Sequence, residues 1–212
     1  ATSHMPHGHC TGQVRARAET AEDDDADTLK GEGGDDIIQG EAGADIMTGG
    51  LGADTFKVDS GSDIIVDLGG SGSGGENDVL IVSSGATATA TNIVNFTATG
   101  TSTRNDGTAN LTAKASTNAT INVSASAAGL YTINGNTGDD NLTGGSGNDI
   151  IKGGDGADII IGGAGDDAIT GDAGDDSFTG GTGNDTFNVN NGIDTITTNK
   201  PLSIRNYLEA SK

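Results

Sequence analysis

The sequence has very few aromatic residues, no tryptophan, a single cysteine and no long apolar run. Aromatic residues make up 3% of the 212 positions and all hydrophobic residues 32%, which is little for a conventional core of this size. The single cysteine, Cys10, excludes an intrachain disulfide framework. No apolar run reaches the roughly 18 residues that a transmembrane helix needs. By composition alone the chain would be disordered, so another source of folding free energy is expected.

Basic residues are scarce as well, with 10 Lys and Arg against 31 Asp and Glu and a formal net charge of -21. Such a surface repels phosphates and anionic lipid headgroups, so we expect neither nucleic acid nor a membrane surface as a partner. The HExxH and GxSxG motifs of hydrolases are missing, and no histidine follows residue 9 to act as a general base. We therefore expect no catalytic residues and no enzymatic activity in this chain.

Glycine, in contrast, is abundant, with 37 residues. Together with aspartate it recurs every nine residues in the unit G-x-x-G-x-D-x-U-x, where U is apolar. The first-position glycines are Gly31, Gly40, Gly49, Gly135, Gly144, Gly153, Gly162, Gly171 and Gly180. The sixth-position aspartates are Asp36, Asp45, Asp54, Asp140, Asp149, Asp158, Asp167, Asp176 and Asp185, and degraded units add Asp63 and Asp194 in the same frame. The chain therefore contains a short and a long array of one repeat.

This spacing predicts a parallel β-solenoid. One apolar residue between two others suits a strand of three residues whose middle side chain points inward. Glycines at the first and fourth positions permit the tight turn that follows. Two units would then form one turn of the solenoid, and stacked turns would bring alternate aspartates onto the same edge.

Rows of like carboxylates need a cation between them. Carboxylate and peptide-carbonyl oxygens favour Ca²⁺, whereas Mg²⁺ prefers a strict octahedron with bound water. Zn²⁺ prefers nitrogen and sulfur donors, and the arrays contain no His or Cys. Apolar burial in the arrays is too small to offset the ordering of the backbone, so we expect calcium binding and folding to be one event.

On these residues the chain resembles the RTX family (repeats in toxin, the hemolysin-type calcium-binding repeats) over residues 22–66 and 135–197. The resemblance implies an all-β fold in which each of these two ranges is a parallel β-roll. It also implies that calcium lies between turns two units apart, bound by the glycine-rich turns and the aspartates, so that the glycines and aspartates named above are the candidate ligands. Counting degraded units, we predict about eight ions. The family pattern also has a glycine at the second position of the unit, directly after the first. Four units of this chain depart from it there, with Glu32, Glu41, Asn136 and Asp172.

Residues 67–134 connect the two arrays and are rich in Thr, Ser and Ala. The alternation in ATATATNIVNFTATG and the apolar run Val79–Val82 favour strands. Leu111, Ile121 and Ile133 are then inward residues of irregular solenoid turns that join the two rolls. A flexible linker is the alternative. This texture is similar to that of bacterial surface-layer and adhesin proteins.

The ends of the chain carry no repeat. Residues 1–21 are interpreted as a disordered or cloning-derived tail, because Ser-His-Met at residues 3–5 looks like a cloning remnant. A metal site formed by His4, His7, His9 and Cys10 is the alternative. Residues 198–212 are expected to be a peripheral tail.

Two functions fit these observations. The first is a structural calcium-binding segment of a surface-layer or adhesin-like protein that self-associates on a bacterial surface. The second is the calcium-dependent C-terminal folding and secretion module of a toxin or exoenzyme whose catalytic domain is not in this chain. In both, the family implies the type I secretion machinery as a partner and an extracellular or cell-surface location.

Overall fold

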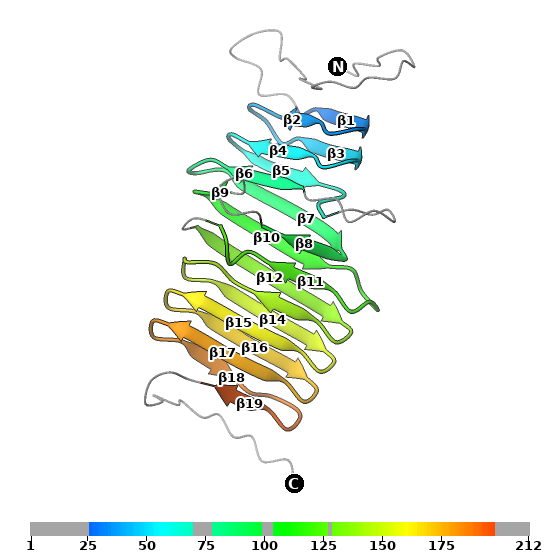
Figure 1. The fold of residues 1–212 in the computed structure, drawn as a ribbon. Helices are drawn as coiled ribbons and strands as arrows, with labels where there is room; N and C mark the ends of the chain where they lie inside the picture. Colours follow the sequence, from blue (N-terminus) through cyan, green and yellow to red (C-terminus); the bar gives the residue numbers. More distant parts are fainter. Residues whose placement is uncertain (1–25, 70–77, 99–103, 127–128, 198–212) are drawn as a thin grey trace.

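The computed structural model describes residues 26–69, 78–98, 104–126 and 129–197, which form a parallel β-solenoid (Figure 1). One side is a nine-stranded sheet in which all neighbouring strands run parallel. Its strands in spatial order are β1 (Thr28–Gly33), β3 (Ile46–Leu51), β5 (Ser62–Ile65), β7 (Thr87–Ile93), β10 (Thr108–Ala113), β12 (Leu130–Thr137), β14 (Ile150–Asp155), β16 (Ala168–Ala173) and β18 (Thr186–Asn188). The solenoid predicted from the repeat is confirmed.

Two smaller parallel sheets form the opposite side. The four-stranded sheet contains β2 (Ile37–Gln39), β4 (Thr55–Val58), β6 (Val79–Val82) and β9 (Arg104–Asn105). The six-stranded sheet contains β8 (Asn95–Thr97), β11 (Thr120–Asn122), β13 (Asn141–Thr143), β15 (Ile159–Ala164), β17 (Ser177–Thr182) and β19 (Thr195–Thr197). Successive strands alternate between the two sides. The exception is β8 and β9, which follow each other on the side opposite the nine-stranded sheet. No helix in the described ranges is long and apolar enough to cross a bilayer.

The repeat length sets the step from one turn to the next. In the arrays each strand pairs with a strand eighteen residues further along, as Ile150 pairs with Ala168. Where the first array meets the connecting segment, Ser62 pairs with Thr87, twenty-five residues further along. Two units therefore form one turn, as predicted, and the connecting segment adds loop residues without interrupting the nine-stranded sheet.

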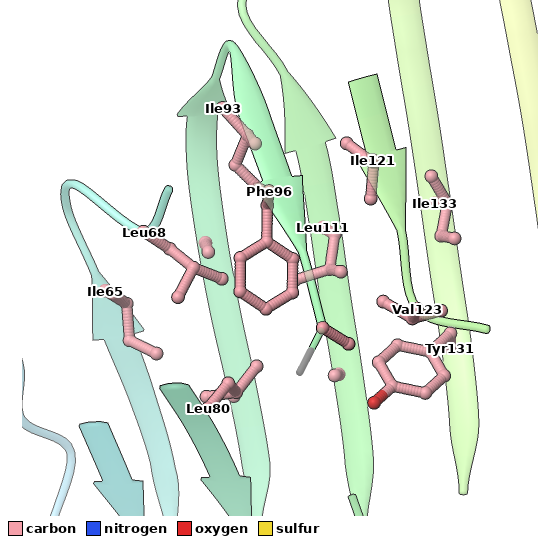
Figure 2. Packing of buried hydrophobic residues seen from close by; sticks show 14 of the residues in the cluster. Ile65, Leu68, Leu80, Ile93, Phe96, Leu111, Ile121, Val123, Tyr131 and Ile133 are labelled. Carbon is pink, nitrogen blue, oxygen red and sulfur yellow. The ribbon is translucent and has the colours of Figure 1, made fainter. Parts of the chain in front are cut away.

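A column of buried side chains fills the space between the two sides (Figure 2). In the arrays each apolar eighth-position residue from β2 to β17 is at most 1% exposed; these are Ile38, Met47, Phe56, Leu142, Ile151, Ile160, Ile169 and Phe178. The inward pattern predicted for the eighth position is thus confirmed. Phe187 in β18, which belongs to the last described turns, is only partly buried.

The described part of the connecting segment is β structure, and the linker alternative is wrong there. Leu111 in β10 and Ile133 in β12 lie on the nine-stranded sheet, whereas Ile121 in β11 lies on the opposite side. All three side chains are fully buried, as predicted. The two rolls are therefore joined by β strands that continue the same core (Figures 1 and 2).

Several array strands are longer than the three residues predicted. β3 and β14 to β17 have six residues each, because they continue through the first three positions of the next unit. In β14, for example, Gly154 still pairs with Asp172 of β16. Three residues then separate Asp155, the end of β14, from Ile159, the start of β15. The glycine turns are thus partly strand, since a residue without a side chain lets neighbouring backbones stay paired.

The interpretations of the two tails, residues 1–21 and 198–212, lie outside the described residues. So does the alternative metal site at His4, His7, His9 and Cys10.

Candidate metal-binding turns

The aspartates of the repeat form two rows, each at an edge where a turn leads into a strand. Alternate units fall in the same row because each solenoid turn takes two units. The row that leads into the nine-stranded sheet holds Asp27, Asp45, Asp63, Asp149, Asp167 and Asp185, and the opposite row holds Asp36, Asp54, Asp78, Asp140, Asp158, Asp176 and Asp194. All are buried except the half-buried Asp27, Asp185 and Asp194 near the ends of the stack. Every predicted aspartate therefore lies in one of the two rows.

One carboxylate oxygen of every row aspartate except Asp27 and Asp36 is bound to the backbone of the preceding turn. The N–H of Asp140 donates to Oδ1 of Asp158 (2.8 Å), and the N–H of Asp158 donates to Oδ1 of Asp176 (2.9 Å). The same bond joins Asp27 to Asp45, Asp36 to Asp54, Asp45 to Asp63, Asp149 to Asp167, Asp167 to Asp185 and Asp176 to Asp194. This oxygen has a structural role, because it links turns that are eighteen residues apart.

The other carboxylate oxygen is oriented into the turn. In Asp36, Asp63, Asp140, Asp158, Asp167 and Asp176 the buried Oδ2 accepts no hydrogen bond from the described residues. Burial of such a group without a partner costs at least about 1–3 kcal/mol. A Cβ atom placed on Gly31 would lie 2.5 Å from both Oδ2 of Asp36 and the carbonyl oxygen of Gly49. Carboxylate and carbonyl oxygens therefore face one space between successive turns.

The predicted first-position glycines border this space. A Cβ atom at any of the nine would meet Oδ2 of the aspartate five residues later; the glycines are Gly31, Gly40, Gly49, Gly135, Gly144, Gly153, Gly162, Gly171 and Gly180. At Gly135, Gly144, Gly153 and Gly162 it would also meet the carbonyl oxygen of the glycine in the next turn of the same row. A side chain here would fill the space that the oxygens face, which explains the need for glycine.

These donors fit a hard divalent cation. In the part of the chain that the structure describes, no three carboxylate, imidazole or thiol groups come together. Peptide carbonyl oxygens of the glycine-rich turns can complete the coordination of a cation between the turns. Ca²⁺ accepts six to eight such oxygens, whereas zinc sites are built from nitrogen and sulfur. The unpartnered Oδ2 atoms and the glycine carbonyls are thus a suitable donor set for calcium.

The chain matches the family of RTX calcium-binding nonapeptide repeats over residues 23–56, 134–169 and 161–196. The two arrays are RTX repeats. The resemblance seen in the sequence is confirmed, and the chain is an RTX calcium-binding β-roll module. No curated protein and no solved structure matches the chain significantly. The number of ions, about eight, remains a prediction.

Burial raises the pKa of several buried RTX aspartates. For Asp158 it is the larger cause of a rise in pKa to about 6, to which the neighbouring carboxylates of Asp176 and Asp140 contribute. Burial together with neighbouring carboxylates also raises the pKa of Asp63 and of Asp167 to about 6. Without a cation, the folded rows take up protons at a higher pH than an unfolded chain does.

Acid is therefore expected to stabilise the calcium-free fold. The pKa of Asp158 is about 6 in the folded chain against an ordinary value of 3.8, so the folded state binds more protons between these values. Its stability should rise as pH falls from 7.5 through 6 toward about 4, and be lost as pH rises again. Far-UV circular dichroism in chelator at pH 7.5, 6 and 4.5 measures this, as a β signal that grows when the pH falls. With saturating calcium the trend should reverse, because protons compete with the cation for the carboxylates. A calcium-free fold that gained stability with rising pH would contradict the burial of these groups.

Asp78 belongs to a carboxylate row but was not among the predicted ligands. Its Oδ1 accepts the N–H of Asp54 (2.9 Å), and its Oδ2 accepts the N–H of Gly69 (2.7 Å). It lies twenty-four residues after Asp54 rather than eighteen, and so falls outside the nine-residue frame. The available signal was local, since Asp78-Val79-Leu80 has the same aspartate-x-apolar order as the RTX unit.

A second ladder at the fifth position of the RTX unit was also not predicted. Here Oδ1 of Asp139 accepts the N–H of Ala157 (2.9 Å), the residue eighteen positions later. The same bond joins Asp35 to Ala53, Asn148 to Asp166, Asp166 to Asn184 and Asp175 to Ile193. The sixth-position side chains accept hydrogen bonds from the preceding turn, and the fifth-position side chains accept them from the following turn. Each turn is therefore hydrogen-bonded through side chains to both of its neighbours. The signal was that Asp or Asn occupies the fifth position in most units.

The four units without glycine at the second position keep the turn conformation. Glu32, Glu41, Asn136 and Asp172 have φ values of 76°, 67°, 73° and 72°, in the left-handed region that glycine otherwise occupies. A different change occurs at Gly145, whose N–H donates to Oδ2 of Asp149 (2.7 Å). That turn, at the base of the second array, has one free carboxylate oxygen fewer to offer a cation.

Both carboxylate rows end on apolar residues of the connecting segment. In the turn that precedes Asp149, Tyr131 occupies the row position that an aspartate holds in the arrays. Its N–H donates to Oδ1 of Asp149 (2.9 Å). Ala119 occupies the equivalent position in the turn that precedes Asp140, and its N–H donates to Oδ1 of Asp140 (2.7 Å). The Tyr131 hydroxyl is bonded to Ser126 (2.6 Å) within the core. At this end of the second array the carboxylate rows are thus followed by turns in which Tyr131 and Ala119 occupy the aspartate positions.

Proposed function

We propose that this RTX module is a structural segment of a secreted surface-layer or adhesin-like bacterial protein, folds on binding calcium outside the cell, and catalyses no reaction itself. The observation that carries the proposal is the row of buried Oδ2 atoms without a hydrogen-bond donor. Folded turns built this way are incomplete at neutral pH until a cation neutralises them. The residues that would hold calcium are the row aspartates and the glycine-rich turns that they face.

Folding that depends on calcium suits a secreted protein. Extracellular calcium modules bind with dissociation constants of roughly 10⁻⁴–10⁻³ M, so their sites are empty where free calcium is scarce and fill outside the cell. A chain with 31 acidic residues and 32% hydrophobic residues stays expanded until then. The type I secretion machinery, implied by the RTX family, would carry it in that expanded state.

A structural role is favoured over a tail role by the way the arrays are joined. β7, β10 and β12 of the connecting segment continue the nine-stranded sheet from one array into the other, which makes one long element (Figure 1). The alternative is a C-terminal folding and secretion module of a toxin or exoenzyme. Light scattering in calcium separates the two, since assembly supports the structural role and a strictly monomeric solenoid supports the alternative.

Calcium titration tests the shared mechanism. We expect far-UV circular dichroism to change steeply from coil to β near millimolar calcium, and magnesium at the same concentration to leave the coil spectrum unchanged. Steepness is expected because neighbouring turns share hydrogen bonds and charges. A β spectrum in excess chelator at neutral pH, unchanged by calcium, would show that another force folds the chain.

A further inference from the structure

The outer face of the nine-stranded sheet carries no acidic side chain in its two central rows, although the chain has a net charge of -21. In each strand one outward residue stands on either side of the buried one. From β1 to β18 the first row is Thr28, Ile46, Ile64, Thr89, Asn110, Thr132, Ile150, Ala168 and Thr186. The residues that follow the buried one form the second row, Lys30, Thr48, Val66, Thr91, Thr112, Asn134, Lys152, Thr170 and Asn188; here Val66 comes directly after β5, and the register between β7 and β10 shifts beside Thr112. The carboxylate rows lie in the turns beside the face. This face is where another surface of like charge can approach.

Apolar side chains stand exposed on the same face. Ile46 and Ile64, which are register partners in β3 and β5, are 39% and 45% exposed, and Val66 beside them is 43% exposed. Ile150, in β14 of the second array, is 42% exposed. The face thus has exposed apolar side chains on both sides of its central strand, β10.

The first row is a chemical palindrome about Asn110. β10 is the fifth of the nine strands. Moving outward from it in both directions, Thr89 corresponds to Thr132, Ile64 to Ile150, Ile46 to Ala168 and Thr28 to Thr186. A two-fold axis through Asn110 and parallel to β10 would place each residue of one copy on its counterpart in a second copy. Polar residues would meet polar ones, and apolar residues apolar ones.

We propose that two copies of this chain pack these faces together about that two-fold axis, with their solenoid axes antiparallel. This rests on the proposed structural function and specifies how the segment self-associates. An interface of this kind is isologous, so a pattern that reads alike from both ends is what it requires. In the second row Lys152 meets Val66, which its methylene stem can cover. A two-fold axis parallel to the solenoid would instead set Ile46 on Thr48 and Ile150 on Lys152.

The contact is small. Nine strands about 4.8 Å apart make a strip roughly 40 Å long, and two outward rows make it roughly 10–15 Å wide. Two such strips bury roughly 800–1,200 Å² in total, at the lower end for specific complexes. The pair is therefore weak in dilute solution and suited to chains crowded on a surface.

Charge exchange across the two-fold axis tests the proposal on the full chain in saturating calcium. Sedimentation velocity should show that Ile64→Glu and Ile150→Lys each weaken dimerisation about tenfold or more, because each buries an unpaired charge. The double variant should restore it, since each Glu then faces a Lys of the other copy. Ile159→Glu is the control, because Ile159 is 50% exposed on β15 of the opposite side. Circular dichroism in calcium establishes that each variant folds.

Cysteine cross-linking tests the axis without adding charge. Face-packed sheets lie about 10 Å apart, too far for a direct disulfide, so the thiols are joined with a short bifunctional maleimide in place of an oxidant. In a Cys10→Ser background, Asn110→Cys should cross-link to itself with this reagent, and Thr179→Cys in β17 on the opposite side should not. Dimers that persist unchanged in both single charge variants would overturn the face while leaving the structural function intact. A wild-type chain that folds in calcium but stays monomeric at millimolar concentration would overturn the dimer and the structural function together. The calcium-folding mechanism would still stand.

Discussion

Replacement of Gly156 by alanine is expected to destabilise the calcium-loaded solenoid by about 2–5 kcal/mol, because strain and overpacking add at this site. Gly156 is the fourth residue of its RTX unit, with φ of +138°. An added Cβ atom would meet the carbonyl group of Gly138 in the turn below. Neighbouring turns are hydrogen-bonded to each other there, so neither backbone can withdraw without breaking the stack.

Gly34 is the matched control. It occupies the same fourth position and also has positive φ, +102°, but it lies in the first described turn, where a Cβ atom would meet nothing within 4 Å. Gly34→Ala should therefore show only the cost of the left-handed conformation, about 1–2 kcal/mol. Urea unfolding of the two variants in saturating calcium measures both. Equal losses of stability would mean that turn stacking does not explain the glycine requirement.

The second large effect is expected at Asp158, which lies in the interior of its row. Asp158→Ala removes the acceptor of the Asp140 N–H and one of the unpartnered carboxylate oxygens that suit calcium. Loss of a hydrogen bond to a charged group costs about 1.5–3 kcal/mol, which corresponds to roughly a 10- to 150-fold weaker apparent calcium affinity. The calcium titration should also become less steep, since the row is cut between Asp140 and Asp176.

Asp194 is the control for that change. It also accepts an N–H, that of Asp176 (3.1 Å), but it is half-buried and belongs to the last turn. Water can replace its carboxylate, and within the described residues no further turn of the row depends on it. Asp194→Ala should therefore shift the calcium midpoint only a few-fold, as expected for about 0–1 kcal/mol. A shift as large as that of Asp158→Ala would contradict the ladder as the unit of cooperativity.

The candidate site could be predicted only where the nine-residue frame holds. Asp140, Asp149 and Asp158 follow one another at a constant spacing, so the sequence alone assigns them to alternating rows. Asp78 could not be placed in this way, because the insertion before it changes the step from eighteen to twenty-four residues. Only the pairing of Thr55 with Val79 brings it above Asp54.

The roles of the two carboxylate oxygens were also beyond the sequence. Spacing indicates that aspartates stack, but not that Oδ1 of Asp158 is bound to the backbone below while Oδ2 has no donor. Likewise the fifth-position residues Asp139 and Asn148 could be taken for solvated surface groups. Their bonds to the following turn depend on the exact offset between stacked turns, which a linear pattern does not contain.

The sequence by itself determined the solenoid class, the two-unit turn, the inward apolar column and calcium as the cation, because each follows from a periodicity that backbone geometry converts directly into position. Tertiary structure alone decided how Leu111, Ile121 and Ile133 join the arrays, where the carboxylate rows end at Tyr131 and Ala119, and which outer residues share a face. In the connecting segment the turns differ in length, so contacts between residues more than twenty positions apart depend on packing rather than on period. The palindromic face about Asn110 exists for the same reason, since its nine strands become neighbours only when all the turns are stacked.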